Sequence, residues 1–455
     1  MTHRYIPNTD ADARTMLEAI GVPSLDALFE PVPAAVRLTR DLDLPPALSE
    51  PDLMAHLRAL AGQNADSSKT ASFLGAGAYR HFAPSFIDQL LLRSEFYSAY
   101  TPYQPEIAQG TLQAIFEFQT LVAQLMGTDL ANASMYDGST ATAEAAMMAC
   151  RLVKRERVVV ARSVHPHYRE VLATYARNLG LAIVELGYAP DGTIDRAALA
   201  EAAPGAAAVI FQYPNFFGAI EDPRPVVELA KAAGAMSVAV VTEPVAMGLL
   251  TPPGSLGVDI VAAEMQALGV PVGFGGPYCG VLAVSDKCMR QMPGRFVGMA
   301  TDTEGRTGYV LTLATREQHI RREKATSNIC TNSGLMALSA TMFMAAYGKE
   351  GLPELARLNF DKAHYAQAEI ARLSKAGGAA PRFAAPFFNE FVVGGLGDAA
   401  AVRQRLLGEG ILAGVPLGRD YPELADSLLV CVTELNRAED IDRLAAGLAG
   451  SRQER

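Results

Sequence analysis

Two apolar, strand-like runs in the middle of the chain end at acidic residues, in places where an enzyme can do chemistry. The first run ends at Glu243 and the second at Glu264. In α/β enzymes that hold pyridoxal phosphate as a Schiff base, an acidic residue ends one such strand and a lysine follows the other. Here Met265 follows the second strand, and the chain has no lysine between Lys231 and Lys287. The sequence therefore contains the acidic residue that such a cofactor site requires but lacks the lysine.

Three features lie at the carboxyl ends of expected strands, where open parallel sheets bind their ligands. A glycine and hydroxyl turn at 136–142 opens a helix. It either binds an anion through its backbone N–H groups and hydroxyls or forms an ordinary Ser/Thr N-cap. His165 follows another apolar run and either stacks on a planar cofactor or has a structural role. Glu243, which precedes Pro244, is either a cofactor partner or a hydrogen-bonded carboxylate at the sheet edge.

A polar segment at 99–110 is rich in groups that could act on a substrate. It contains Tyr100, Tyr103, Gln104 and Glu106, and its prolines fix the backbone in an extended form. Rigid extended loops that are dense in polar groups are typical of a binding edge rather than of a core. We therefore interpret these four residues as candidate catalytic groups.

A second polar segment, at 316–332, reads as a strongly basic helix followed by short hydroxyl and amide side chains. Thr326, Ser327 and Asn328 are the first of these. The segment is either a solvated charged helix with a turn, or an anion-contacting loop that reaches a neighbouring subunit.

A doubly wound α/β domain would position these groups. Runs that are apolar on both faces are typical of a parallel sheet covered by helices, and the right-handed crossover rule then predicts three layers. The expected strands of this sheet are 157–161, 181–186, 207–213, 236–243 and 258–264. A helix is expected at 111–126 before them, and two strands near 389–393 and 428–433 with a final helix from about 438 after them. The expected domains are an N-terminal arm (1–70), a large α/β domain (71–333), and a linking helix with a small α+β domain (334–455).

Composition excludes several classes of protein. The chain has 455 residues, 50% of them hydrophobic, and a net charge of -10, which argues against nucleic-acid or anionic-membrane partners. Its five cysteines lack metal-ligand spacing, so we expect reduced thiols, no metal site and a cytoplasmic protein. The N-terminus lacks an apolar signal core. The longest apolar stretch, 334–348, is too short to span a bilayer.

Three long strings, at 100–106, 132–138 and 315–332, closely resemble the glycine cleavage system P-protein family. The resemblance covers nearly the whole chain and matches the alpha subunit, which is the N-terminal half of the fused enzyme. It implies a type I pyridoxal-phosphate-dependent transferase fold and an alpha2beta2 heterotetramer whose beta subunit carries the Schiff-base lysine. It also implies the reaction in which glycine loses CO2 and its aminomethyl group passes to the lipoyl arm of the H-protein.

The resemblance also implies roles for the two polar segments. The residues expected to project into the partner's active site are Tyr100, Tyr103, Gln104 and Glu106. Those expected near the phosphate of the cofactor bound by the partner are Thr326, Ser327 and Asn328. Arg321 and Arg322 are expected either to meet the acidic carrier protein or to hold the interface.

Two alternatives remain open at the level of the sequence. The chain could be a catalytically silent structural or regulatory protein that keeps a decayed cofactor frame. It could also be a self-sufficient aminotransferase or desulfurase, but this requires a lysine that the sheet does not supply. Lys324 is the candidate for that role, and it lies in the basic segment, far in sequence from Glu243.

Overall fold

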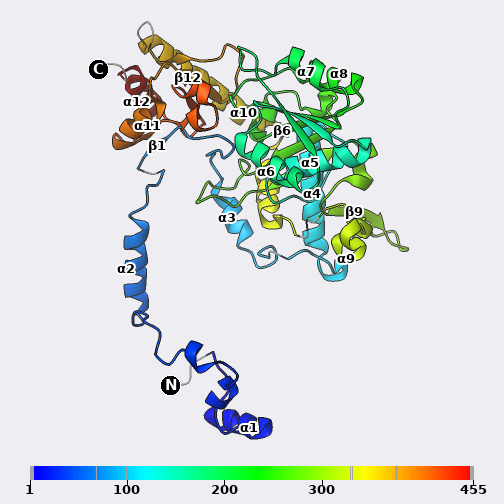
Figure 1. Ribbon diagram of the computed structural model, residues 1–455, viewed down its shortest axis with the longest axis vertical. Coiled ribbons are helices and arrows are strands. Elements are labelled where there is room, and N and C mark those ends of the chain that lie inside the picture. The colour runs from blue at the N-terminus through cyan, green and yellow to red at the C-terminus, as the bar shows by residue number, and fades with distance from the viewer. Residues whose placement is uncertain are drawn as a thin grey trace. The chain divides into compact units, whose positions relative to one another are not determined.

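The computed structural model describes residues 5–450 except 68, 99, 328, 330 and 375–377. The chain divides into two compact units, Met1–Ala65 and Asp66–Arg455 (Figure 1). Among the described residues, none of the helices combines the length and the apolar character that a bilayer crossing requires. The domain boundaries expected at residues 70 and 333 stay a prediction.

The first unit consists of short capped helices. Its two α-helices are α1 (Asp10–Ile20) and α2 (Glu50–Ala61). Thr9 and Asp12 form a capping box at the start of α1, and the Ser49 side chain caps α2, which satisfies N–H groups that a helix start leaves open. Neither helix has a buried residue. The large exposed apolar side chains of the unit include Met16, Ile20, Phe29, Leu53, Met54, Leu57 and Leu60.

The second unit is built on a seven-stranded sheet with the order β2-β8-β7-β6-β5-β3-β4. The strands are β2 (Leu130–Ala131), β3 (Arg157–Ala161), β4 (Ala182–Leu186), β5 (Ala208–Gln212), β6 (Met236–Val241), β7 (Ile260–Glu264) and β8 (Gly280–Val284). Strands β3 to β7 are parallel, at the places expected from the sequence. The sheet is nevertheless mixed, because β8 and β2 are antiparallel. The chain returns from β7 to β8 through residues 265–279, which contain no helix that could serve as the usual parallel crossover.

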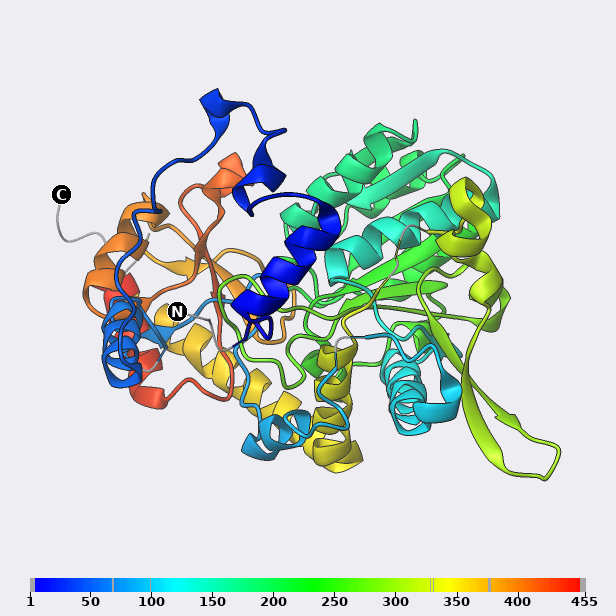
Figure 2. The same ribbon diagram turned by 90° about the horizontal axis from the view of Figure 1, so that it is seen from below.

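Helices cover this sheet, as Figures 1 and 2 show. They include α4 (Gln109–Met126), α5 (Gly138–Val153), α6 (Pro166–Arg177), α7 (Arg196–Ala202) and α8 (Pro223–Ala232). Every residue of β5, β6 and β7 is buried, which is the pattern of strands that are packed on both faces. Helix α3 (Ser85–Leu91) lies before α4 in the chain.

A long helix, α10 (Gly334–Leu373), leads to a smaller α+β part, with a break in helical geometry at Gly348. A four-stranded antiparallel sheet follows in the order β11-β12-β15-β14. Its strands are β11 (Ala380–Pro381), β12 (Glu390–Gly394), β14 (Val415–Pro416) and β15 (Leu428–Cys431). The other elements are α11 (Ala399–Gly408), α12 (Ala438–Ala449), and β13 (Ile411–Leu412), which pairs with β1 (Ala71–Ser72). A second hydrophobic core lies here.

A β-hairpin formed by β9 (Phe296–Thr301) and β10 (Thr307–Thr312) stands out from the sheet (Figure 2). Two glutamines of α4 hold it. Gln119 donates to the Val297 carbonyl (3.0 Å) and accepts from the Val297 N–H (2.9 Å). Gln109 makes the same pair of bonds to Tyr309. The hairpin is thus fixed at its base to helix α4.

The basic helix expected in the first part of segment 316–332, before Thr326, is wrong. The structure has only short turns there, with α9 limited to Gln318–Arg321. Arg322 has a positive φ of 54°, which a continuous α-helix does not permit. The side chain of Arg316 donates to the carbonyl of Leu313 (3.1 Å) and to that of Gly294 (3.0 Å). These bonds fold the segment back on the start of the hairpin instead of extending it as a helix.

Candidate functional site

The carboxyl ends of the parallel strands are crossed by residues 75–82 of the same chain, which we call the crossing segment. The Ala76 N–H donates to Glu390 Oε1 (2.7 Å), and the Ala76 carbonyl accepts from His165 Nε2 (2.8 Å). Ligands of open parallel sheets bind at this edge. The crossing segment therefore lies where such a ligand would bind.

Tyr79 is the largest side chain of the crossing segment and is 2% exposed. Its N–H donates to Gln266 Oε1 (2.9 Å). Its hydroxyl donates to Glu390 Oε2 (2.7 Å) and lies 3.2 Å from Thr242 Oγ1. Burial raises the pKa of the phenol well above its usual range, and burial also raises the pKa of Glu390 to about 7. The ring of Tyr79 is therefore buried in this chain, and its hydroxyl is hydrogen-bonded within the chain.

His165 has both of its ring nitrogens bonded within the chain. Nε2 donates to the crossing segment, and Nδ1 accepts from the His167 N–H (3.1 Å). Burial lowers the pKa of His165 to about 4, so the imidazole is neutral, in agreement with one donating and one accepting nitrogen. The rings of Tyr168 and Phe216 pack against it.

Glu264 occupies the N-terminus of α5, the end of a helix that attracts anions. Its carboxylate accepts from the N–H groups of Gly138 (2.9 Å), Gln266 (3.0 Å) and Cys279 (2.8 Å). Burial raises the pKa of Glu264 to about 7, against the effect of these three bonds. Asp137 caps the same helix. The helix therefore has an N-cap, but the capping residue is Asp137 and not the serine or threonine that was expected.

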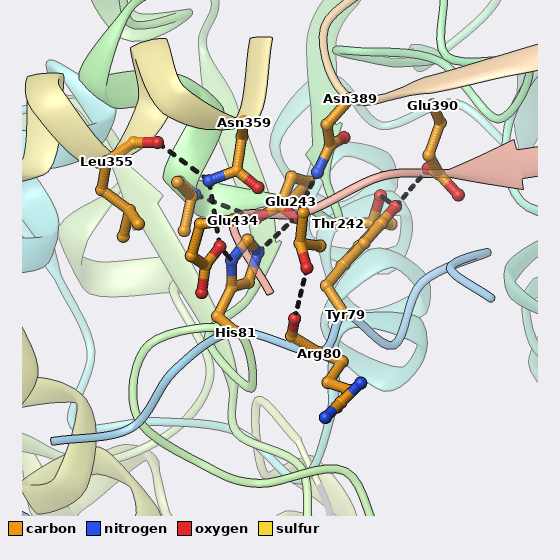
Figure 3. A network of polar contacts seen from close by, with 12 residues as sticks. Tyr79, Arg80, His81, Thr242, Glu243, Leu355, Asn359, Asn389, Glu390 and Glu434 are labelled. Carbon is orange, nitrogen blue, oxygen red and sulfur yellow. Dashed lines mark hydrogen bonds and ion pairs between the residues drawn. The ribbon is translucent and has the colours of Figure 1, made fainter. Parts of the chain in front are cut away.

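His81, in the crossing segment, lies between two carboxylates (Figure 3). Its Nε2 is 2.9 Å from Glu243 Oε2, and its Nδ1 is 2.8 Å from Glu434 Oε2. Asn389 donates to the same oxygen of Glu243 (3.1 Å), and Asn359 donates to the same oxygen of Glu434 (3.1 Å). The side chain of His81 is 2% exposed. Glu243 is thus a hydrogen-bonded carboxylate whose partners belong to its own chain.

The charges of this cluster support one another. Burial alone would lower the pKa of His81, but the two carboxylates raise it to about 10. Burial would raise the pKa of Glu434, but the hydrogen bond from His81 holds it below its usual range. We conclude that His81 is an imidazolium at neutral pH. It connects the end of β6 to the residues that follow β15 and, through Asn359, to α10.

The residues predicted in the first polar segment lie at the surface. Tyr100 is 90% exposed and Tyr103 is 58% exposed. Gln104 and Glu106 are exposed as well, and the segment forms a single 3-10 turn at Pro105–Ile107. These side chains are available to another molecule.

Two of the residues predicted in the second segment, Thr326 and Ser327, make hydrogen bonds within their own chain. The Ser327 hydroxyl donates to Glu144 Oε1 (2.8 Å) and accepts from the Ile329 N–H (3.2 Å). The Thr326 N–H donates to the Arg316 carbonyl (3.1 Å). Asn328 lies outside the described residues. Burial raises the pKa of Glu144, whose other oxygen has no hydrogen-bond partner within the described part of the chain.

The structure brings the two polar segments together. An apolar pocket over helix α4 is lined by Tyr100, Thr101 and Pro102 of the first segment, by Asn332 at the end of the second segment and by Leu335 of α10. The segments also share a buried arginine. Arg295 pairs with Glu317 in the second segment and donates to the hydroxyl of Tyr103 in the first.

Sequence reasoning missed Arg295, Glu144, His81 and Tyr79. Arg295 follows a Pro-Gly turn and resembles any surface arginine in the sequence. Tyr79 and His81 follow the closely spaced glycines Gly75 and Gly77, and aromatic and titratable groups directly after such a pair were a signal that could have been used. Their partners lie 162 residues or more away along the chain, so spacing could not reveal them.

Comparison with known proteins gives consistent matches over the whole chain. The sequence profile of the family described as "Glycine cleavage system P-protein" matches residues 3–448. A protein of Anoxybacillus flavithermus described as a probable glycine dehydrogenase (decarboxylating) subunit 1 is 51% identical over 450 residues, which are 98% of this chain and 99% of that protein.

Solved structures agree with this match. A crystal structure of glycine decarboxylase (P-protein) of the glycine cleavage system, in inhibitor-bound form, has a TM-score of 0.88 and 42% identity, with 99% of this chain and 100% of that chain covered. A sphingosine-1-phosphate lyase of Burkholderia pseudomallei has a TM-score of 0.65 at 16% identity, with 92% of this chain and 94% of that chain covered. The second likeness concerns the fold alone.

Proposed function

The chain belongs to the glycine cleavage system P-protein family, and we propose that it is the subunit of a split glycine dehydrogenase (decarboxylating) that lacks the Schiff-base lysine. In this proposal it pairs with a beta subunit in an alpha2beta2 heterotetramer. The beta subunit holds pyridoxal phosphate, which supplies the electron sink for decarboxylation of glycine. The aminomethyl group then passes to the lipoyl arm of the H-protein.

One observation carries the assignment of the lysine and the cofactor to the partner. At the end of β7, where a cofactor lysine would follow, the chain has Met265, and the preceding residue, Glu264, fills the N-terminus of α5 with its own carboxylate. A phosphate at that N-terminus would meet Glu264 and Asp137, and like charges that close repel each other. The crossing segment narrows the space beside this helix end, because Ala76 and Gly77 line the small cavity that Asp137 and Glu264 also line. The residues of this chain therefore do not fit a cofactor of their own.

We propose that the first polar segment completes the partner's active site. Its four candidate residues, Tyr100, Tyr103, Gln104 and Glu106, are exposed, as this role requires. For the second segment we keep the proposal that Thr326, Ser327 and Asn328 lie near the phosphate of the cofactor bound by the partner. Ser327 donates its only hydroxyl proton to Glu144, so a bond from Ser327 to that phosphate requires an exchange of partners.

The isolated chain is expected to form no covalent adduct with pyridoxal phosphate and to catalyse no exchange of the glycine carboxyl carbon with bicarbonate. The reason is the missing amine at position 265. The measurement is borohydride reduction with labelled cofactor, followed by peptide mapping of the chain alone and of the complex with the beta subunit.

Label confined to the partner, together with activity that returns when the partner is added, supports the proposal. Label on any lysine of this chain, Lys324 included, would contradict it. A complex that stays inactive would favour the structural or regulatory alternative.

The chain is also expected to form an obligate complex that buries well over about 2,000 Å², as permanent complexes do. The apolar side chains of the first unit are exposed, and those of Phe82, Phe86, Tyr97, Tyr100 and Ile107 are exposed as well. Surfaces of this kind mark interaction sites. Sedimentation with equimolar beta subunit should give one species of heterotetramer size.

A chain that begins at Asp66 provides a matched control for this expectation. It keeps all the buried residues of the hydrophobic cores, because none of them lies before Phe73. We expect it to fold and to bind the beta subunit more weakly. A full-length chain that sediments as a stable monomer beside its partner would rule out the obligate complex.

A further inference from the structure

One buried arginine, Arg295, joins the two polar surface segments. Its Nη1 lies 2.8 Å from Glu317 Oε2, and its Nη2 donates to the Tyr103 hydroxyl at 2.6 Å. The guanidinium carbon lies 4.8 Å from the centroid of the Tyr103 ring. Tyr103 belongs to segment 99–110 and Glu317 to segment 316–332, so one guanidinium group holds a residue of each.

The main chain around Arg295 is fixed as well. Its carbonyl accepts from the Ala133 N–H at 2.9 Å. The preceding residue, Gly294, has a φ of 84°, and a Cβ there would lie 2.7 Å from the side-chain nitrogen of Asn132, so glycine is needed at this position. The Gly294 carbonyl accepts from Arg316 of the second segment. The arginine therefore projects from a rigid base.

The chemistry of the guanidinium determines what Tyr103 can offer. Arginine has only donors and remains protonated in proteins, so the Tyr103 oxygen must be the acceptor of their bond. The phenolic proton is then left to be donated to a group outside the chain. Lysine cannot replace this arrangement fully, because its ammonium lacks the planar fork that reaches two partners at once.

We propose that Arg295 is a positioning residue for the reaction of the assembled enzyme. It fixes the hydroxyl of Tyr103 as a hydrogen-bond donor toward the partner's active site. Through Glu317 it also holds the start of the second segment at a fixed position relative to Tyr103. This inference rests on the function proposed above and assigns the orientation of Tyr103 to a residue that does not itself touch the substrate.

The test is a double-mutant cycle in the complex with the beta subunit. Arg295→Met, Tyr103→Phe and the double variant are compared by kcat for glycine decarboxylation, expressed per assembled complex measured by sedimentation. We expect Arg295→Met to lower kcat by about 10²-fold, the size of effect that misplacement of a positioned group by 1 Å can produce. In the Tyr103→Phe background the same change should have much less effect, because the hydroxyl that it positions is already absent.

Two further variants keep the test decisive. Arg295→Lys retains the charge and should recover part of the lost kcat, and it carries the test if Arg295→Met does not assemble. Arg224→Met removes an exposed surface arginine and should leave kcat near the parental value.

A parental complex without activity would contradict the proposed function. Arg295 variants that keep parental kcat per complex in an active enzyme would overturn only this inference. Losses that multiply independently in the double variant would overturn it too, since Arg295 would then act by another route.

Discussion

Replacing Tyr103 by phenylalanine, or Glu106 by glutamine, is expected to lower the turnover of the assembled enzyme by about 10² to 10⁴, the range for a positioned acid, base or hydrogen-bond donor. Both side chains are exposed, and an exposed substitution such as Glu106→Gln usually changes stability by about 0.5 kcal/mol or less. Tyr103→Phe keeps the ring that lies over Arg295 and removes only the hydroxyl. The loss should therefore appear in kcat and not in assembly. Steady-state kinetics of glycine decarboxylation, with sedimentation of each variant complex, measures both quantities.

Matched substitutions far from the two segments serve as controls. Tyr365→Phe, on α10, removes a hydroxyl that bonds Asp442, and Glu228→Gln changes an exposed carboxylate on α8. Both should retain parental rates. If Tyr103→Phe and Glu106→Gln also assemble normally and keep near-parental rates, the first segment is only interface packing.

Replacing His81 by glutamine is expected to lower the free energy of unfolding of the chain by about 3 to 5 kcal/mol, the usual effect of removing one member of a buried ion pair. The substitution leaves Glu243 and Glu434 buried without the cation between them. Urea unfolding at pH 7 measures the difference. His56→Gln, at an exposed position on α2, is the control and should leave the midpoint unchanged.

The stability difference between the parent chain and His81→Gln should also depend on pH, and the sign of this dependence is defined. The pKa of His81 rises from 6.5 in the unfolded chain to about 10 in the folded chain, so the folded chain binds the proton more tightly. The stabilisation is complete below pH 6.5 and is lost as the pH rises through about 10. The stability difference between parent and His81→Gln should therefore shrink between pH 7 and pH 10.

Two carboxyl groups that do not contact His81 leave this difference unaffected. Glu390 and Glu264, whose pKa values burial raises to about 7, are present in both proteins and cancel in the difference. A difference that stays constant up to pH 10.5 would show that His81 is not the proton-binding group.

The strand positions could be predicted from the sequence because each strand is a short apolar run with its own signal. Runs that end at Glu243 and Glu264 became β6 and β7, in the pyridoxal-phosphate-dependent transferase-like fold that was expected. The antiparallel edge was missed, since the direction of β8 depends on the turn before it and not on its composition. The basic helix was wrong for a related reason. The bond from Arg316 to the carbonyl of Gly294, 22 residues away, outweighs the helical propensity of the local residues.

The residues of the candidate site also differ in whether local sequence or distant partners determine their roles. Tyr100, Tyr103 and Glu106 could be proposed from the sequence because prolines and polar groups lie next to one another there. Arg295 and His81 could not, because their roles come from partners that only folding brings near. The lysine was predicted to be absent from position 265 without any structure, but the carboxylate that fills the helix N-terminus required the fold.

Glu264 at the N-terminus of α5 has a consequence for enzyme engineering. A designer who wished to give this chain a cofactor of its own could not do so by introducing Met265→Lys alone. The carboxylate of the preceding residue, Glu264, would still hold three backbone N–H groups, one of them at the start of α5. A working design would have to change Glu264 as well, so that phosphate could use the helix, and would have to move the crossing segment with Tyr79 out of the way. Such a design would therefore need three coordinated alterations.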